Sequence, residues 1–193
     1  MKKGKKPLTL YAIAHTQSFY NHLHIFAGRK DSRLTPLGHR NAEMLAKKLK
    51  GKDIGFIYVS PLLRARETAR YVHRYYPDAK VIIDKRLMER DYGKLSGKSK
   101  DKFAREHPDL WPLYHRSYTV PPPGGESIKQ LEKRALSLLR EIVPVMRKAG
   151  KSALIVAHSN TLRPIRRRFE KLTPQEMMKL EGQYNKIYSY KIR

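Results

Sequence analysis

Two short stretches, Ala14-His15-Thr16-Gln17-Ser18 and Ala157-His158-Ser159-Asn160, decide the fold of this chain. The first follows the apolar run of residues 8–13 (LTLYAI), and the second follows the apolar run of residues 153–156 (ALIV). Apolar runs of this length, each ending in a polar stretch, predict buried strands. In an open α/β sheet the carboxyl ends of the strands border the ligand crevice, so we expect the two histidines to face one another across one site.

A single histidine at a strand end more often satisfies local hydrogen bonds than takes part in catalysis, but two at equivalent positions shift that balance. Further polar groups follow other apolar runs. Ser60 to Thr68 contains Arg64 and comes after the run of residues 56–59, and Leu87 to Gly93 contains Glu89. A nucleophile, an anion-binding cation, a proton donor and a second histidine are the groups needed to move a phosphoryl group.

The composition limits the kind of protein. At 193 residues, with no linker rich in Pro, Gly or Ser, the chain is expected to form one domain over residues 1–193. No cysteine is present, which excludes disulfides, thiolate metal sites and a cysteine nucleophile. No apolar stretch is as long as a membrane span, and the start MKKGKK does not begin a secretion signal. We therefore expect a soluble, cytoplasmic protein with no membrane partner.

The charge is strongly positive, with 42 Lys and Arg against 17 Asp and Glu and a formal net charge of +25. Such a chain attracts polyanions and anionic metabolites. The only tight basic clusters are the amino-terminal lysines and Arg163 with residues 166–168, and no zinc-finger spacing, basic heptad region or base-stacking strand pair accompanies them. We expect any binding of nucleic acid to be weak, sequence-indifferent and steeply salt dependent.

Strand and helix patterns alternate along the chain, which is typical of βαβ units. Strands are predicted at residues 8–13, 56–59, 81–83, 153–157 and, as an edge strand, 187–190. Helices are predicted from the Thr35 cap to Gly51, over about 61–76, from Glu126 or Ser127 to about Gly150, over 161–172, and after the capping box 173–176. Residues 93–125 lack clear periodicity and gather Gly, Pro and aromatic residues, as expected of an insertion that caps a site.

At these residues the chain resembles the histidine phosphatase superfamily, which contains the cofactor-dependent phosphoglycerate mutases and many phosphatases. The resemblance covers nearly the whole length and follows the order of the family's motifs. The matching segments are residues 14–21, the region of Leu34, Thr35 and Gly38, residues 60–68, residues 87–93 and residues 157–163. The implied fold is a three-layer α/β/α sandwich with a mostly parallel central sheet, like that of the phosphoglycerate mutases.

The resemblance also implies roles for individual residues. His15 is the nucleophile that accepts the phosphoryl group, as a neutral imidazole with one free nitrogen. Arg64 and His158 bind the equatorial oxygens of the phosphoryl group, and Glu89 exchanges the proton with the leaving group or with water. Neutral donors around the phosphate are expected from Thr16, Asn21 and Ser159. The cationic side chains take the place of a metal ion, so no metal is expected and no cofactor is required.

Each of these assignments has a structural alternative. Arg64 could cap a helix face in solvent, and Glu89 could pair with Arg90 or Lys94. The joint occurrence of all the groups in family order makes these alternatives minor.

The chain departs from the family pattern at two places. Ala14 stands where the family has the arginine of its first motif, and Thr16 and Ser159 stand where it has glycine after each histidine. The lost arginine removes a bidentate charged contact that a neutral donor does not replace. Either Arg29 or Arg163 fills its place, or the enzyme is weakened, or the alanine was introduced deliberately.

The substrate side resembles two branches of the family. Tyr92, Lys100 and Arg116 resemble mutase residues that engage a phosphoglycerate and its carboxylate, with 2,3-bisphosphoglycerate as primer. Residues 107–111 and 123–127 resemble the broad phosphatase branch. A mutase needs an ordered lid against water, and residues 182–186 leave little chain for one, which favours hydrolysis of a small phosphomonoester.

A third interpretation of the function is a weakened or non-catalytic member that binds polyanions through its basic surface. In the first two interpretations the partner is a small phosphorylated metabolite. A dimer is one option for the oligomeric state.

Overall fold

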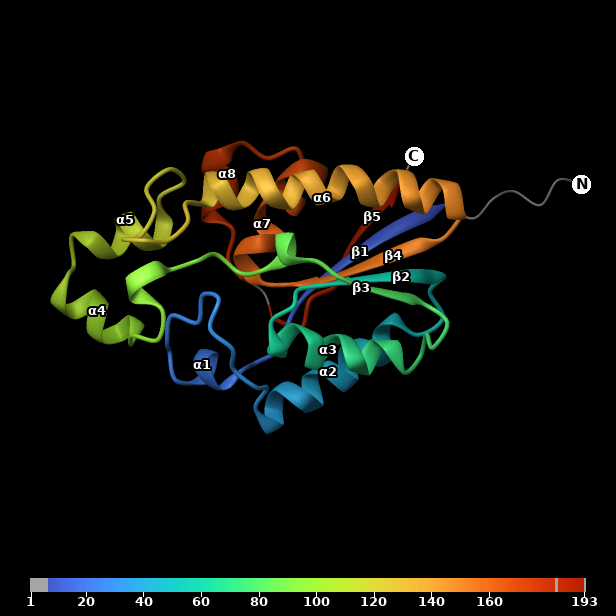
Figure 1. Cartoon of the computed structure of the whole chain (residues 1–193), viewed down its shortest axis with the longest axis horizontal. Coiled ribbons are helices and arrows are strands. Elements are labelled where there is room, and N and C mark those ends of the chain that lie inside the picture. The colour runs from blue at the N-terminus through green and yellow to red at the C-terminus, as the bar shows by residue number, and fades with distance from the viewer. Residues whose placement is uncertain (1–6, 183, 193) are drawn as a thin grey trace, which may run out of the picture.

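A central sheet of five strands organises the chain in this computed structural model, which describes residues 7–182 and 184–192 apart from the side chain of residue 116. The strand order is β3-β2-β4-β1-β5 (Figure 1). The bounds are β1 Leu8–Ala14, β2 Ile54–Val59, β3 Lys80–Ile83, β4 Ser152–Ala157 and β5 Tyr188–Ile192. The first four strands run parallel, and β5 pairs antiparallel with β1 at the edge, so the mostly parallel sheet is confirmed.

The two central strands bring the two histidines together. β1 and β4 are neighbours in parallel register, with Ala14 opposite Ala157. β4 is buried along its whole length, as expected of a strand covered on both faces, and β1 is buried at its carboxyl end, over residues 12–14. Because the register is level, His15 and His158 leave the sheet side by side, and the backbone NH of His15 donates to the carbonyl oxygen of Ala157 at 2.9 Å.

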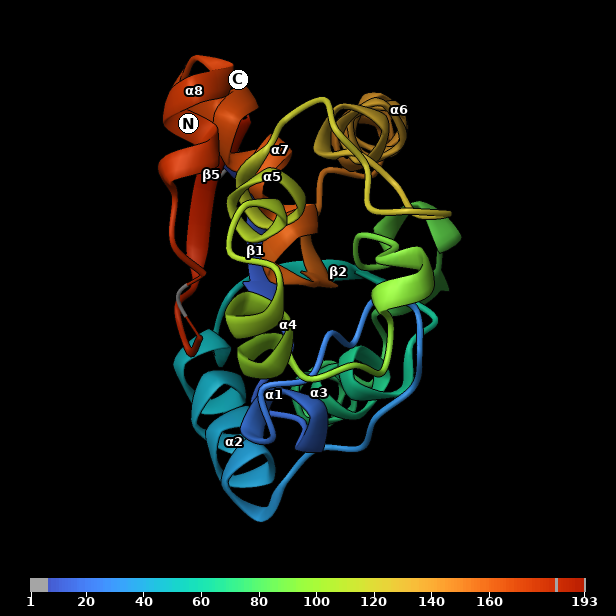
Figure 2. The ribbon, with the colours of Figure 1, turned by 90° about the vertical axis from the view of Figure 1, so that its left-hand side faces the viewer.

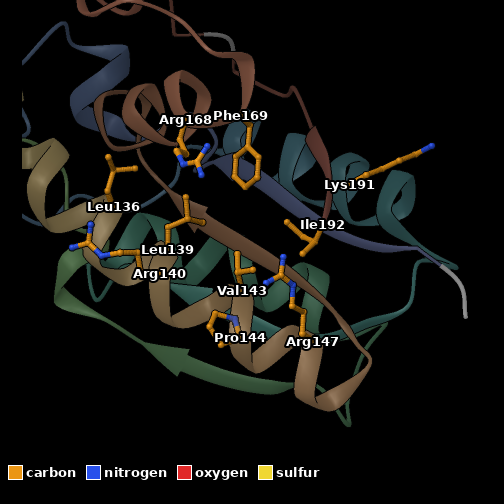
Figure 3. Close-up of a pocket in the computed structure, with 10 residues that line it drawn as sticks. All are labelled: Leu136, Leu139, Arg140, Val143, Pro144, Arg147, Arg168, Phe169, Lys191 and Ile192. Carbon is orange, nitrogen blue, oxygen red and sulfur yellow. The ribbon is translucent and has the colours of Figure 1, made fainter.

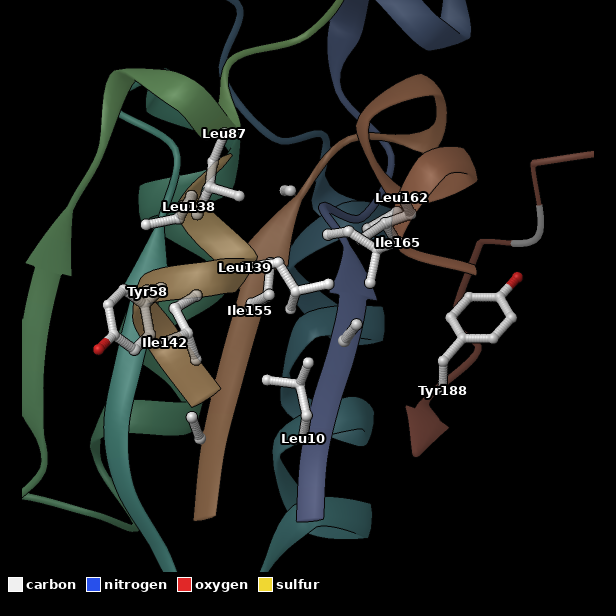
Figure 4. Close-up of a cluster of buried hydrophobic side chains, with 14 of the residues drawn as sticks. Leu10, Tyr58, Leu87, Leu138, Leu139, Ile142, Ile155, Leu162, Ile165 and Tyr188 are labelled. Atoms are coloured by element: carbon white, nitrogen blue, oxygen red, sulfur yellow. The ribbon is translucent and has the colours of Figure 1, made fainter. Parts of the chain in front are cut away.

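Two layers of helices cover the sheet, which completes the α/β/α sandwich (Figures 1 and 2). The layer of α6 (Ile128–Ala149) and α7 (Ser159–Glu170) packs on a core that contains Leu10, Leu139 and Ile155 (Figure 4). The layer of α2 (Pro36–Leu49) and α3 (Leu63–His73) packs on the opposite core, which contains Ile13. Successive strand side chains point to opposite faces, so β1 contributes to both cores.

Local signals in the sequence fix the helix ends. The Thr35 side chain accepts a hydrogen bond from the backbone NH of Gly38, with Pro36 in the first turn, and α2 begins there as predicted. Ser127 and Gln130 form a capping box at the start of α6, which ends before the left-handed Gly150. The box of Thr173 with Glu176 opens α8 (Pro174–Lys179). The helix predicted over 161–172 begins two residues earlier, because His158 itself is its N-cap.

The segment 93–125 contains two short helices that its sequence pattern did not reveal. They are α4 (Lys100–Glu106) and α5 (Leu110–Arg116), and they lie beyond the carboxyl ends of the parallel strands (Figure 1). Each has seven residues, too few for a helical repeat to stand out. The remaining short elements are α1 (Phe19–His22), η1 (Lys85–Leu87) and η2 (Gly93–Leu95).

A small core of its own holds this segment. Phe26 contacts the rings of Tyr92, Phe103 and Trp111. The fully buried guanidinium of Arg90 donates to the backbone carbonyl oxygens of Glu126 at 2.8 Å, Tyr114 at 2.7 Å and Val120 at 3.2 Å. One buried cation therefore ties the last turn of α5 and the chain that follows it to the segment just before α6. None of the helices among the described residues has the length and apolar character to cross a membrane.

Candidate active site

His15 is held in one tautomer at the end of β1. Its Nδ1 lies 2.7 Å from the carbonyl oxygen of Thr16, and because a carbonyl only accepts, Nδ1 carries the proton. The Nε2 lone pair then accepts a hydrogen bond from Nε of Arg64 at 3.2 Å. Burial, followed by the charge of Arg64, lowers the pKa of His15 to about 3, against the Thr16 hydrogen bond that raises it. The imidazole is therefore neutral at physiological pH.

Arg64 is an interior residue and not a cap in solvent. It lies in the first turn of α3 with no exposed surface, and its two terminal nitrogens donate to the carbonyl oxygens of Gly28 and Lys30, each at 2.8 Å. Burial lowers its pKa, and the charge of Glu89 is the largest effect in the opposite direction. Because two of its donors are anchored on backbone, the guanidinium is fixed beside Nε2 of His15.

His158 lies next to His15 but has different partners. The ring centroids of the two histidines are 5.0 Å apart in an edge-on arrangement. Nε2 of His158 lies 2.8 Å from the hydroxyl of Ser60, at the end of β2, while its buried Nδ1 has no hydrogen-bond partner in the part of the chain that the structure describes. Burial is the main cause that lowers the pKa of His158 well below its usual value, followed by the charges of Arg64 and His15.

A pocket of about 270 Å³ opens in front of His15, whereas His158 is fully buried beside it and is not one of the residues that line the pocket. Seven of the residues predicted from the sequence line it: His15, Asn21, Arg64, Glu89, Tyr92, Lys100 and Ser159. Eight further lining residues were not predicted as site residues, although the sequence had offered Arg163 as a substitute for an arginine at position 14. They are Ala27, Gly28, His115, Asn160, Arg163, Glu181, Gly182 and Tyr184. Larger hollows exist elsewhere on the molecule, but their walls contain neither His15 nor Ser159, the lining residues that follow the ends of β1 and β4.

Glu89 faces the pocket without an arginine or lysine partner of the kind considered from the sequence. Its carboxylate accepts the backbone NH of Arg90 at 2.8 Å, while the Arg90 side chain is committed to three carbonyls elsewhere. Arg134 of α6 holds this stretch of chain, because it donates to the carbonyl oxygens of Met88 at 2.7 Å and Glu89 at 3.1 Å. Arg134 is itself paired with both carboxylate oxygens of Glu126, each at 2.7 Å.

Asn21 and Thr16 differ in what they offer to a ligand. The side-chain oxygen of Asn21 accepts from Ser18, with the hydroxyl at 2.9 Å, which leaves its NH₂ group as a donor for the pocket. Thr16 is fully buried, its hydroxyl donates to the carbonyl oxygen of Gly38 at 2.8 Å, and it does not line the pocket. The close approach requires glycine, since a Cβ on Gly38 would lie 2.1 Å from the carbonyl oxygen of Gln17.

The opposite wall comes from the start of α7. Ser159 and Asn160 form its first turn, and the positive end of a helix dipole favours an anion there. Nδ2 of Asn160 donates to the Tyr92 hydroxyl at 3.2 Å. Gly182 lets the later chain close against this turn, because a Cβ there would meet the Ser159 hydroxyl at 2.8 Å.

The expected substrate-binding residues are partly accounted for. Tyr92 and Lys100 line the pocket, and the side chain of Arg116 lies outside the described part of the structure. Burial raises the pKa of Tyr92 and lowers that of Lys100, with Glu89 as the largest opposing charge for the lysine. In the described ranges, no group of three or more His, Asp or Glu side chains is placed to hold a metal ion.

The structure separates the two arginines considered as replacements at position 14. Arg29 faces Asp91 at 3.4 Å and Glu126 at 3.7 Å and does not line the pocket. Arg163 lines the pocket and also a smaller hollow beside Ala14, and its terminal nitrogen donates to the carbonyl oxygen of Met178 at 3.3 Å.

Neutral buried histidines, a fixed arginine and a carboxylate at the carboxyl ends of a parallel sheet define an enzyme class that moves phosphoryl groups by way of histidine. The sequence profile of one family matches residues 10–193 of the chain. The chain belongs to the histidine phosphatase superfamily (branch 1).

Relatives and solved structures agree with this placement. The chain is 37% identical to the 2,3-bisphosphoglycerate-dependent phosphoglycerate mutase of Brucella anthropi, over 90% of this chain and 86% of the relative. It is 41% identical to the mutase of the same name from Methylobacterium sp. (strain 4-46), over 89% of this chain and 85% of that one. The structure of Bacillus stearothermophilus YhfR is similar with a TM-score of 0.83 and 28% identity, over 94% and 90% of the two chains.

A mycobacterial glucosyl-3-phosphoglycerate phosphatase shares the fold, with a TM-score of 0.84 at 24% identity, over 95% of this chain and 90% of that one.

Proposed function

We propose that this chain interconverts 2- and 3-phosphoglycerate through a phosphohistidine at His15, with 2,3-bisphosphoglycerate as primer. The observation that carries the proposal is that three cationic side chains line the pocket, against the two carboxylates of Glu89 and Glu181. Arg64 stands beside the nucleophile, and Lys100 and Arg163 line the same space. A substrate with a carboxylate as well as a phosphate uses this additional charge. Relatives 37–41% identical over nine-tenths of the chain bear the name of this mutase.

His15 starts the reaction from its Nε2 lone pair. As the bond from Nε2 to phosphorus forms, the phosphorus–oxygen bond to the donor breaks, and Glu89 gives its proton to the departing alkoxide. In the return step the hydroxyl of a monophosphoglycerate attacks phospho-His15, and Glu89 takes back the hydroxyl proton. When the 2-hydroxyl of 3-phosphoglycerate attacks, the product is 2,3-bisphosphoglycerate and His15 is free again. His15 then takes the phosphoryl group from position 3, which leaves 2-phosphoglycerate and restores the phosphoenzyme.

Arg64 and His158 stabilise the phosphoryl oxygens in this proposal. The Arg64 Nε–H that now bonds His15 passes to a phosphoryl oxygen as the phosphorus takes its place. If the Ser60 hydroxyl donates to Nε2 of His158, the unpartnered Nδ1 carries a hydrogen and is a ready donor. Asn21 and the first turn of α7 with Ser159 complete the ring of donors.

The alanine at position 14 is accommodated through Arg163. Ala14 takes the place of the arginine usual in the family's first motif, and Arg163 lines both the hollow beside it and the main pocket. We infer that Arg163 supplies the positive charge there, whereas Arg29 is held by two carboxylates outside the pocket.

The cap interpretation of residues 93–125, within one domain over 1–193, forms part of the same proposal. Lys100 and His115 reach the pocket from this segment, and with Tyr92 and Arg116 they would receive the substrate's carboxylate. The pocket is also lined by Glu181, Gly182 and Tyr184. This later part of the chain therefore encloses the pocket more than its short length suggests.

Hydrolysis of a small phosphomonoester is the second candidate function. It is favoured by residues 107–111 and 123–127, which resemble the phosphatase branch and lie in or beside the cap. The first steps are the same, and the difference is whether Glu89 activates water or a sugar-acid hydroxyl against phospho-His15.

Incubation with 3-phosphoglycerate and with p-nitrophenyl phosphate, each with and without 2,3-bisphosphoglycerate, tests the proposal. Primer-dependent formation of 2-phosphoglycerate, faster than release of phosphate, is the expected result. Release of phosphate from either substrate without 2-phosphoglycerate assigns the hydrolase. No reaction with either substrate overturns both and leaves the polyanion-binding interpretation.

A further inference from the structure

A second hollow lies away from the active site, between α6, α7 and the end of β5, with a volume of about 710 Å³ (Figure 3). It lies toward the amino ends of the parallel strands, because Ile192 in its wall pairs with Leu8 at the start of β1. His15 stands at the other end of that strand. None of the residues that line this hollow lines the catalytic pocket.

The floor of the groove is apolar. It consists of Leu136, Leu139, Val143, Phe169 and Ile192, which point toward one another in Figure 3. Four of them are partly buried side chains at the margin of the main core, and Leu139 belongs to that core. The ring of Phe169 stacks on Tyr190 with centroids 4.4 Å apart, which fixes one wall. The groove is therefore an open edge of the packed interior.

The rim of the groove is positively charged on both sides. Arg140 and Arg147 stand on α6, and Arg168 and Lys191 stand on the facing elements; all four are exposed. No acidic side chain among the described residues lines the groove. Carboxylates in the adjoining turns are already paired, Glu141 with Arg86 and Glu170 with Arg166 and Tyr190.

Stabilisation of the helix ends explains only part of this charge. Cations near the carboxyl ends of α6 and α7 offset their dipoles, which accounts for Arg147 and Arg168. It does not account for Arg140, two turns earlier, for Lys191 on a strand, or for the apolar floor between them. Arg147 lies seven positions after Arg140 on α6, so positive charge extends over about 10 Å of the groove.

We propose that this groove binds an acidic amphipathic helix of a partner protein. An apolar stripe on such a helix fits the floor, and carboxylates on its two flanks meet the two rims. A fatty acid has one carboxylate, so it would pair with one rim cation and bring no negative charge to the other three. A nucleic acid finds one aromatic ring, already stacked on one face, and a second copy of this chain is repelled by a net charge of +25.

The test uses a fluorescein-labelled synthetic peptide of 14 residues with leucine on one helical stripe and glutamate on both flanks. We expect saturable binding by fluorescence anisotropy at fixed ionic strength near physiological. Replacement of the glutamates by glutamine, or scrambling of the sequence, weakens binding at least about tenfold, because either change destroys the match of charge or of apolar stripe.

Two protein variants locate the site, and a third controls for overall charge. Arg140→Glu with Arg168→Glu reverses both rims, and Val143→Gln makes the floor polar at constant charge. We expect each to weaken peptide binding about tenfold while phosphoglycerate turnover is unchanged. Lys48→Glu with Lys52→Glu changes the net charge equally on exposed positions of the α2 side, and we expect binding there to stay near wild type.

Equal loss in the rim and the control variants would show that the peptide responds to overall charge, which overturns the proposal. Equal binding of the scrambled peptide, or absence of binding, also overturns it. Phosphatidylglycerol vesicles and a single-stranded RNA are measured in parallel. If either competes through Val143 and the rim while the peptide does not bind, the groove belongs to a different ligand.

Discussion

The end of β1 and the end of β4 look alike in sequence and differ in chemistry. Each strand ends in alanine followed by histidine, and the two alanines face one another in register. His15 is bonded through both ring nitrogens, to the Thr16 carbonyl and to Arg64, whereas His158 is bonded to Ser60 and leaves Nδ1 unpartnered within the described chain. The two histidines occupy equivalent positions on one sheet, but their hydrogen-bond partners differ, and the partners give each ring its own chemistry.

The largest effect should come from removing the histidine of β1. His15→Ala deletes the only nitrogen proposed to bond phosphorus, so we expect turnover to fall by about 10⁴-fold or more and acid-labile labelling from a phosphorylated substrate to vanish. The exposed His22→Ala is the matched control and should behave as wild type. Labelling that persists on another residue of the His15 variant would end the distinction between the two strand ends.

Removing the histidine of β4 should slow the reaction without abolishing it. His158→Ala takes away one preorganised donor, and we expect kcat to fall about 10²–10³-fold while His15 still becomes labelled, more slowly. Ser60→Ala keeps the ring but removes the contact to Nε2, and a smaller loss is expected. Rapid-quench measurement of phosphoenzyme formation checks both. An unchanged labelling rate in His158→Ala would mean that its Nδ1 does not serve the phosphoryl group.

An arginine introduced at position 14 tests whether the two alanines that end β1 and β4 have different surroundings. If Arg163 supplies the charge missing at position 14, Ala14→Arg should raise kcat/KM by less than about tenfold, well under the 10²–10³ that a missing donor costs. In an Arg163→Met background the same change should restore more activity than in wild type. Kinetics at constant salt measure both steps, since the basic surface also attracts substrate. Equal gains in the two backgrounds would contradict the replacement.

The smallest effect concerns stability against pH. The pKa of His15 is about 3 in the folded chain and that of His158 is also lowered, against 6.5 for an ordinary histidine. Folded stability from keeping these rings neutral is present above pH 6.5 and is lost as pH falls toward 3, because only the unfolded chain takes up the protons. Each ring contributes a slope of at most about 1.4 kcal/mol per pH unit.

Urea unfolding between pH 7 and 4 measures that slope for wild type, His15→Gln and His158→Gln. Each variant should lose one ring's share of the slope, and His22→Gln is the surface control. Identical slopes in wild type and both variants would show that these rings are not kept neutral by the fold.

Features with a local signal could be predicted from the sequence, and features made by distant contacts could not. The strands and caps depend on neighbouring residues, so the apolar runs and the Thr35 and Thr173 caps were placed correctly. The Thr16 hydroxyl was expected near phosphate, but Gly38 lies against its loop and takes its hydrogen bond. The pocket residues Asn160, Glu181 and Tyr184 depend on how α7 and the later chain meet, which no periodicity encodes.

The buried guanidinium of Arg90 couples the segment that carries Glu89 to the segment around α5. Arg90 follows the proposed acid Glu89 directly, and its guanidinium holds the carbonyls of Tyr114, Val120 and Glu126. If the segment 93–125 opens as the proposed cap, the buried charge of Arg90 loses its carbonyl partners unless the Arg90 backbone moves with the segment. That movement would displace Glu89. Amide hydrogen exchange in residues 110–120 and around residue 90 should then report a single cooperative unit. A change that loosens this segment to admit a bulkier substrate would therefore also displace the proposed acid Glu89 and lower activity.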